Sequence, residues 1–174
     1  MKYYPVNLNI TNRNCLVVGG GPVAFRKVGM LADCGANVTV VSMDFCDEFQ
    51  KFNNMSSISL VQRKYFPSDL DGKFLVIGAT NNEALNRRIS ADAEKKNMLC
   101  NIADVPEICN FILPSVIRQK DLVIAVSTSG KSPAFAKKLR KDLEKSFGDG
   151  ILVTRSLGKI SLTATRFLSR RRGR

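Results

Sequence analysis

Three small residues, Gly19, Gly21 and Ala24, have the G-x-G-x-x-A spacing of a turn that binds the diphosphate of a dinucleotide. Gly19 would let the backbone turn sharply, and Gly21 has no Cβ to keep a diphosphate away from the main chain. Pro22 suits the first turn of a helix, because an N–H at that position would have no partner. The N–H groups and the dipole of a helix start favour an anion, so the turn predicts a dinucleotide site.

The segments around this turn predict one βαβ unit. An apolar run over residues 15–18 precedes the glycines and is typical of a buried strand. An apolar helical face follows as far as Gly35, a helix-stop residue, and residues 38–41 form a second buried run. The alternative is a tight strand–helix turn that binds nothing, but the βαβ context favours a nucleotide site.

Two further strand ends carry polar residues that could contact the cofactor. Asp44 stands about two residues beyond the second strand, where an acid would bind a ribose hydroxyl. No arginine lies at this strand tip, which favours NAD over NADP. A later buried run, 74–79, ends in polar residues that would face the same crevice. The predicted cofactor-binding residues are Gly19, Gly21, Pro22, Val23, Ser42, Met43, Asp44, Thr80 and Asn81.

The remaining patterns predict an α/β fold, a Rossmann-like doubly wound parallel sheet, over residues 1–110. Strands are expected over 4–10 (a short edge strand), 58–61, 74–79 and 98–102, and helices over 45–52 and 83–96. Residues 111–147 predict a small α+β dimerisation segment, in which an antiparallel strand pair precedes a helix. Residues 148–174 predict a short helical, basic C-terminal tail.

Composition limits the chemistry that the chain can perform. The chain of 174 residues is 44% hydrophobic, which supports a packed core, and it contains no histidine. The commonest general base and metal ligand is therefore absent, so proton chemistry falls to other side chains. Five cysteines without a C-x-x-C spacing are interpreted as reduced core thiols of a cytoplasmic protein. No signal peptide and no membrane-spanning run of about 18–20 apolar residues is expected.

The net charge of +12 suits an anionic partner: a nucleic acid, a membrane surface or a polyanionic small molecule. Basic residues concentrate in 137–145 and 166–174, which we interpret as a solvated helix face and a disordered tail. Nucleic-acid binding is not favoured, because the tail contains a single aromatic residue, Phe167.

Residues 3–147 resemble the precorrin-2 dehydrogenase family of the sirohaem-synthase N-terminal type, some members of which are also sirohydrochlorin ferrochelatases. The glycine turn is generic, whereas three later stretches in this order are specific: 101–104, 110–114 and 127–134. The other stretches that carry the resemblance are Pro5–Leu8, Val17–Ala24 with Arg26 and Lys27, and Gly35–Val41.

The resemblance implies that NAD⁺ oxidises precorrin-2 to sirohydrochlorin on the way to sirohaem. It places the essential aspartate of the family on Asp104, the predicted catalytic residue. The sequence agrees, because Asp104 follows a strand end beside the cofactor crevice and a carboxylate is the natural proton acceptor without histidine. The alternative is an aspartate that caps the turn ahead of Pro106.

The resemblance also implies a polycarboxylate substrate and a homodimer that exchanges elements near 111–147. Hydroxyls, Lys131 and a helix start suit the carboxylates of that substrate. An ordinary capping loop, with Ser132 as the N-cap and Pro133 in the first turn, is the alternative, and the two are compatible. The predicted substrate-binding residues are Asn101, Ser127, Thr128, Ser129, Gly130, Lys131 and Ser132.

No metal-ligand spacing is found in the sequence, and the family usually continues into a longer helical region that helps to close the substrate cleft. Dehydrogenation is therefore favoured, and ferrochelatase activity is left open. The alternative function is a non-catalytic domain that senses NAD(H). Neither nucleic acid nor a membrane is expected as a partner.

Overall fold

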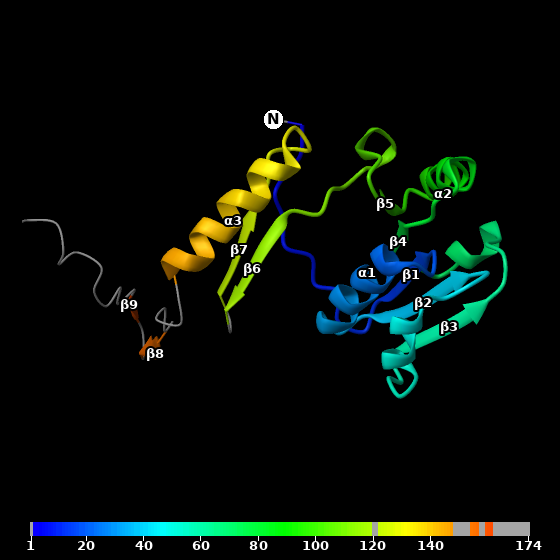
Figure 1. Cartoon of the computed structure of the whole chain (residues 1–174), viewed down its shortest axis with the longest axis horizontal. Helices are drawn as coiled ribbons and strands as arrows, with labels where there is room; N and C mark the ends of the chain where they lie inside the picture. Colours follow the sequence, from blue (N-terminus) through cyan, green and yellow to red (C-terminus); the bar gives the residue numbers. More distant parts are fainter. Residues whose placement is uncertain (1, 120–121, 148–153, 157–158, 162–174) are drawn as a thin grey trace, which may run out of the picture. The chain divides into compact units, whose positions relative to one another are not determined.

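The computed structural model describes residues 2–119, 122–147, 154–156 and 159–161 (Figure 1). The chain divides into two compact units, Met1–Ile112 and Leu113–Arg174. The domain prediction placed its first boundary after residue 110. Each unit is described by itself.

The first unit is built on a five-stranded parallel sheet with the strand order β3-β2-β1-β4-β5 (Figure 1). The strands are β1 (Asn14–Val18), β2 (Asn37–Ser42), β3 (Ile58–Gln62), β4 (Leu75–Gly78) and β5 (Leu99–Ile102). The strand order reverses between β1 and β4, and ligands bind beyond the carboxyl ends of the strands at such a switch point. The predicted doubly wound sheet is confirmed.

Two helices and two short 3₁₀ segments connect these strands, and a third 3₁₀ segment follows β5. The helices are α1 (Pro22–Asp33) and α2 (Glu83–Lys95), and the 3₁₀ segments are η1 (Asp47–Phe52), η2 (Pro67–Leu70) and η3 (Pro106–Ile108). Asn82 caps α2, because its side-chain oxygen accepts the Leu85 N–H at 2.9 Å.

The sheet is buried on both faces, which explains why its strands are continuous apolar runs. Successive residues of a strand point to opposite faces. Val17 and its neighbours pack with Val28 of α1 and the phenylalanines of η1. Leu16 and its neighbours pack with Ile89 of α2 and with Leu70. Each of these fully buried side chains contributes about 1.5–3 kcal/mol to folding.

The predicted edge strand over residues 4–10 was wrong: the described residues that precede β1 form no strand. Tyr4, Val6 and Leu8 lie exposed, with 87%, 60% and 45% of their surface accessible, and Ile10 is buried. An alternating pattern supplies the side chains of a strand but not the neighbouring backbone that a strand needs for its hydrogen bonds.

The second unit begins with the antiparallel pair β6 (Ser115–Gln119) and β7 (Leu122–Val126), followed by α3 (Pro133–Phe147). This confirms the predicted change from parallel to antiparallel pairing. Ile117 on β6 and Ala136 on α3 are buried within this small unit.

A short hairpin lies within the predicted helical tail. Its strands are β8 (Thr154–Ser156) and β9 (Lys159–Ser161), which pair antiparallel. The six described residues of the tail are therefore extended where a helix was expected. A few widely spaced apolar residues do not distinguish a helix from a hairpin, and Thr154 and Ile160 are β-branched residues that favour strands. The rest of the predicted tail lies outside the described residues.

Candidate functional site

The turn after β1 brings three backbone segments into close contact. Gly19 has a φ of +126°, and its N–H donates to the Val41 carbonyl at 2.9 Å. A Cβ at Gly19 would lie 2.3 Å from the carbonyl oxygen of Ala79, which follows β4. Glycine is therefore required here both by its backbone conformation and by the space available.

Gly20, to which the sequence pattern assigned no role, is equally constrained. A Cβ at this residue would lie 1.9 Å from the carbonyl oxygen of Asp44. The Cys46 N–H donates to the Gly20 carbonyl at 2.8 Å. The segment after β2 therefore packs directly on the glycine turn, and the Ser42 hydroxyl donates to the Asp44 carbonyl at 2.7 Å within that segment.

Gly21 differs from its two neighbours because it faces open space. No atom lies within 4 Å of the position that its Cβ would occupy. The helical hydrogen bonds begin with the Phe25 N–H, which donates to the Gly21 carbonyl at 3.0 Å. The N–H groups of Val23 and Ala24 thus precede the hydrogen-bond ladder of α1, and Pro22 occupies the first turn. This open, amide-rich cradle fits the diphosphate of a dinucleotide.

The predicted residues after β2 lie beside this turn. Met43 and Asp44 are exposed, and the side-chain amide of Gln62 donates to the Met43 carbonyl at 3.1 Å. The Asp44 carboxylate is thus on the surface at the carboxyl end of β2, where an acid contacts a ribose in dinucleotide-binding folds.

The loop after β4 is held by the buried side chain of Asn86 from α2. The Thr80 hydroxyl donates to Asn86 Oδ1 at 2.8 Å, and Asn86 Nδ2 donates to the Thr80 carbonyl at 2.9 Å. Asn81 is exposed beside this clamp. These two hydrogen bonds fix the conformation of the loop. The hydroxyl of Thr80 is engaged by Asn86, so the exposed side chain of Asn81 is the one that can contact a cofactor.

Asp104 lies exposed just beyond β5 and has a left-handed backbone, with a φ of +63°. Its turn is anchored to the sheet by the Ala103 N–H, which donates to the Gly78 carbonyl at 2.8 Å. Aspartate enters this region more readily than most residues, and such strain clusters at functional sites.

The half-buried Cys109 and the buried Asn101 support the turn that carries Asp104. The Cys109 thiol accepts the Ile102 N–H at 3.0 Å and lies 3.1 Å from the Val105 carbonyl, to which it can donate. Asn101 is buried, and its amide donates to the Phe111 carbonyl at 3.0 Å. The structure gives Asn101 a supporting position, and its contact with a substrate stays a prediction.

Lys27 was missing from the predicted site. This half-buried side chain lies one helical turn after Val23 on α1, so both occupy the same stripe of the helix. Burial lowers the pKa of Lys27, repulsion from Arg26 lowers it further, and attraction to Asp104 acts in the opposite direction. A half-buried cation that is attracted by the Asp104 carboxylate is a candidate member of the site. Sequence reasoning did not single out Lys27, because a lysine in a helix usually lies on a solvated face.

The residues after β7 belong to the second unit. Ser132 Oγ accepts the Phe135 N–H at 3.3 Å, and Thr128 Oγ1 accepts the Ser132 N–H at 2.9 Å. The helix-capping interpretation of Ser132 is thereby confirmed. Ser129 and Gly130 have positive φ angles, and Gly130 and Lys131 are exposed. The contact of residues 127–132 with a substrate stays a prediction.

Neither a metal-ligand cluster nor a membrane-spanning helix occurs in the described ranges. No group of three or more His, Cys, Asp or Glu side chains there could hold a metal ion. None of the helices in those ranges is both long and apolar enough to cross a bilayer.

Comparisons with known proteins agree with this arrangement. Residues 6–115 match the family model described as putative NAD(P)-binding, and residues 119–146 match that of the sirohaem biosynthesis protein central domain. Siroheme synthase 2 of Klebsiella pneumoniae is 43% identical over 144 residues, which cover 83% of this chain and 32% of that protein. Siroheme synthase 2 of Pectobacterium atrosepticum is 36% identical over 170 residues, 98% of this chain and 36% of that protein.

A solved structure, that of SirC, a precorrin-2 dehydrogenase, is similar to this chain with a TM-score of 0.76 and 29% sequence identity. The similarity covers 84% of this chain and 72% of SirC. The chain spans roughly a third of the length of the curated relatives that it matches, at 32% and 36% of the two proteins above.

The contrast between Gly19 and Gly21 can be tested with alanine. Gly21→Ala places a methyl group in open space, so we expect an unchanged melting temperature and NAD⁺ affinity that falls by about tenfold or more, equivalent to ~1.4 kcal/mol. Gly19→Ala forces a left-handed backbone and a clash, so we expect a loss of about 1–3 kcal/mol of folding stability. Thermal melts and calorimetric NAD⁺ titrations measure both effects. Unchanged NAD⁺ affinity in Gly21→Ala would argue against diphosphate binding at this turn.

Lys27 should reduce the stability of the folded chain at neutral pH. Its pKa in the folded chain lies below its usual value near 10.5, chiefly because it is buried. The folded state thus binds fewer protons than the unfolded state between these two values, and the free energy of unfolding rises with pH there. We therefore expect Lys27→Met to raise the melting temperature at pH 7, with a gain that shrinks towards pH 10. Lys64→Met removes an exposed charge elsewhere in the first unit and is the control. A lower melting temperature of Lys27→Met at pH 7 would contradict the expectation.

Proposed function

This chain belongs to the NAD(P)-binding family of sirohaem biosynthesis, and we propose that it is an NAD-dependent precorrin-2 dehydrogenase that forms sirohydrochlorin. The observation that supports this most directly is the placement of two features at the carboxyl edge of one sheet. The open cradle at Gly21 follows β1, and the strained Asp104 follows β5, with β4 between the two strands. The curated relatives are sirohaem synthases, and the similar solved structure is a precorrin-2 dehydrogenase.

The cofactor assigned to this edge is NAD, whose nicotinamide ring accepts a hydride from the substrate. The N–H groups of Val23 and Ala24 would hold its diphosphate, because they precede the hydrogen bonds of α1. The exposed Asp44 carboxylate would accept a hydrogen bond from a ribose hydroxyl. Asn81 lies at the loop after β4, on the far side of the switch point from Asp44.

Asp104 is the proposed proton acceptor. Oxidation of the macrocycle removes a hydride from one position, and protons must also leave as conjugation extends. Asp104 is an exposed carboxylate on a turn that Cys109 and Asn101 hold from behind, and the chain contains no histidine. The ammonium of Lys27 attracts the Asp104 carboxylate, and it would also attract a carboxylate of the substrate.

The second unit would contribute the substrate loop and a dimer interface. Lys131 and the hydroxyls of residues 127–132 suit the carboxylates of precorrin-2. The side chains of Val123, Phe135 and Leu139 are 52%, 57% and 37% exposed on β7 and α3. A second copy of the chain that covered these apolar side chains would remove them from water, and on this ground we infer a homodimer formed through this unit. The five free cysteines support a location in the reducing cytoplasm.

The catalytic proposal predicts a specific loss of activity in Asp104→Asn. Asparagine also tolerates a left-handed backbone, so the turn and NAD⁺ binding should persist. Because the proton acceptor is gone, NAD⁺-dependent oxidation of precorrin-2 should slow by about 10²–10⁴-fold. The appearance of the sirohydrochlorin absorption bands measures the rate.

Glu107→Gln removes an exposed carboxylate from the following η3 segment and should retain activity, which makes it the matched control. Full turnover by Asp104→Asn would reject Asp104 as the proton acceptor. A wild-type chain that binds NAD⁺ but never oxidises precorrin-2 would instead favour the NAD(H)-sensing alternative.

Addition of Fe²⁺ or Co²⁺ to the completed reaction tests metal insertion, because insertion shifts the sirohydrochlorin bands.

The dimer proposal predicts that Phe135→Glu yields a monomer. A carboxylate in the centre of an apolar interface would be desolvated without a partner. Sedimentation equilibrium should give twice the mass of one chain for the wild type and a single-chain mass for the variant. Met55→Glu, which places the same charge on an exposed apolar residue of the first unit, should remain a dimer. A monomeric wild type would exclude the proposed interface.

A further inference from the structure

The fold brings an arginine to the tip of β2, where the sequence has none nearby. In the register of the sheet, Ser42 at the end of β2 pairs with Gln62 at the end of β3. The next residue, Arg63, donates its N–H to the Ser42 carbonyl at 2.9 Å. Arg63 therefore lies directly beside the Ser42–Asp44 segment. The proposed function assigns the Asp44 carboxylate of this segment to a ribose hydroxyl of the cofactor.

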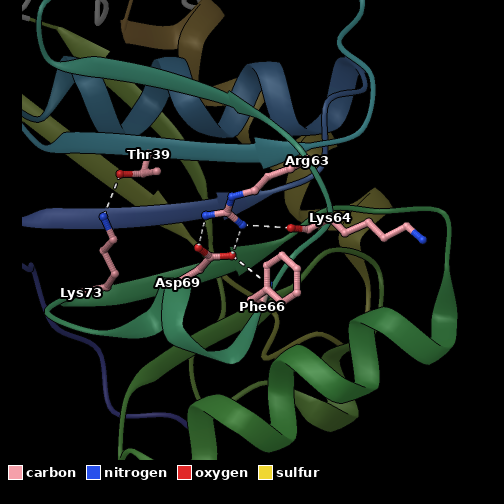
Figure 2. Close-up of polar contacts among 6 residues, drawn as sticks. All are labelled: Thr39, Arg63, Lys64, Phe66, Asp69 and Lys73. Atoms are coloured by element: carbon pink, nitrogen blue, oxygen red, sulfur yellow. Dashed lines mark hydrogen bonds and ion pairs between the residues drawn. The ribbon is translucent and has the colours of Figure 1, made fainter.

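The charge of this arginine is already engaged. Arg63 Nη1 lies 2.9 Å from Asp69 Oδ2 and Nη2 lies 2.6 Å from Asp69 Oδ1, so the two groups form a two-pronged ion pair (Figure 2). Arg63 Nη1 also donates to the Lys64 carbonyl at 2.9 Å. Pairs of this geometry are stronger and more directional than single hydrogen bonds.

Asp69 is itself held from several sides. Its side chain is 9% exposed, against 41% for that of Arg63. Asp69 Oδ2 accepts the Phe66 N–H at 2.9 Å, and the Phe66 ring lies 5.5 Å from the guanidinium carbon of Arg63. The hydrogen bonds from Arg63 hold the pKa of Asp69 below its usual range, so the carboxylate stays charged at neutral pH.

NADP differs from NAD by a phosphate on the adenosine ribose, and an arginine beside the ribose commonly accommodates that group. Here such a phosphate would meet the Asp44 carboxylate, while the neighbouring Arg63 is bound to Asp69. Lys64, the next cation, extends away from this pair (Figure 2). Lys73 donates to the Thr39 hydroxyl at 2.7 Å.

We propose that Asp69 determines cofactor choice in this chain, because it occupies the guanidinium of Arg63 and so denies it to the 2′-phosphate of NADP. The proposal rests on the assignment of a dinucleotide to this edge of the sheet. Asp69 is a specificity-determining residue that acts through Arg63 and does not contact the cofactor. The chain therefore carries an arginine suited to NADP, kept unavailable by a carboxylate six residues later in the sequence.

Asp69→Asn tests this directly. Asparagine can still accept the Phe66 N–H, but it lacks the charge that holds Arg63. Calorimetric titration with NAD⁺ and with NADP⁺ gives the ratio of the two dissociation constants, without any need for precorrin-2. We expect the variant to shift this ratio towards NADP⁺ by about tenfold or more, because an arginine–phosphate pair replaces an arginine–carboxylate pair.

Two controls separate this effect from a general change in charge. Asp71→Asn makes the same substitution nearby at an exposed residue that pairs with Lys96 at 2.7 Å, so the ratio should not change. The double variant Asp69→Asn with Arg63→Met should restore the wild-type ratio. An unchanged ratio in Asp69→Asn, or an equal shift in either control, would overturn the proposal.

A second variant is available if Asp69→Asn does not fold. Asp69→Ser also removes the charge that holds Arg63 and leaves the guanidinium unchanged, so it should likewise shift the ratio towards NADP⁺. An unchanged ratio in the folded serine variant would overturn the proposal. A wild type that binds both nucleotides equally well would do the same. Failure of the wild type to oxidise precorrin-2, with NAD⁺ selectivity intact, would reject the proposed activity and leave this inference standing.

Discussion

The close approach of three backbone segments at the carboxyl edge of the sheet is the constraint on which the site depends. Gly19 lies against the carbonyl of Ala79, and Gly20 lies against that of Asp44, at distances that leave no room for a Cβ. The ends of β1, β2 and β4 are therefore fixed to one another by main-chain contact. Only Gly21, the third glycine, points into open space. Two of the glycines thus build the edge, and the third leaves it accessible.

The features that could be predicted from sequence were those encoded locally. The glycine turn, the buried strands and the change to antiparallel pairing each have a short pattern, and the family that the motifs resemble was correctly identified. Gly20, Lys27 and Arg63 were not recognised, because their importance comes from segments that meet them only in the folded chain. Arg63 lies beside Ser42 because β3 pairs with β2, and nothing in the residues around position 42 indicates this. The strand prediction for residues 4–10 was wrong for the opposite reason: the strand pattern is present in the sequence, but no partner strand lies beside it.

 The residues around the site divide by location into those that oppose folding and those that stabilise it. The left-handed backbone of Asp104 and the half-buried ammonium of Lys27 both oppose folding. Three neighbouring side chains stabilise the fold instead. Cys109, Asn101 and Asn86 form hydrogen bonds with backbone groups and hold the loops after β5 and β4 in place. Asp104 is exposed at the edge of the sheet, whereas Asn101 and Asn86 are buried beneath it.

The positive net charge of this chain favours NADP, whereas the proposed cofactor is NAD. A charge of +12 attracts anions at long range, which suits a polycarboxylate substrate. The same field attracts NADP more strongly than NAD, because NADP carries the additional phosphate. Long-range electrostatics therefore cannot select NAD, and selection requires a short-range contact at the ribose. The pairing of Arg63 with Asp69 meets this requirement, because it removes a cation from that position while it leaves the basic surface elsewhere unchanged.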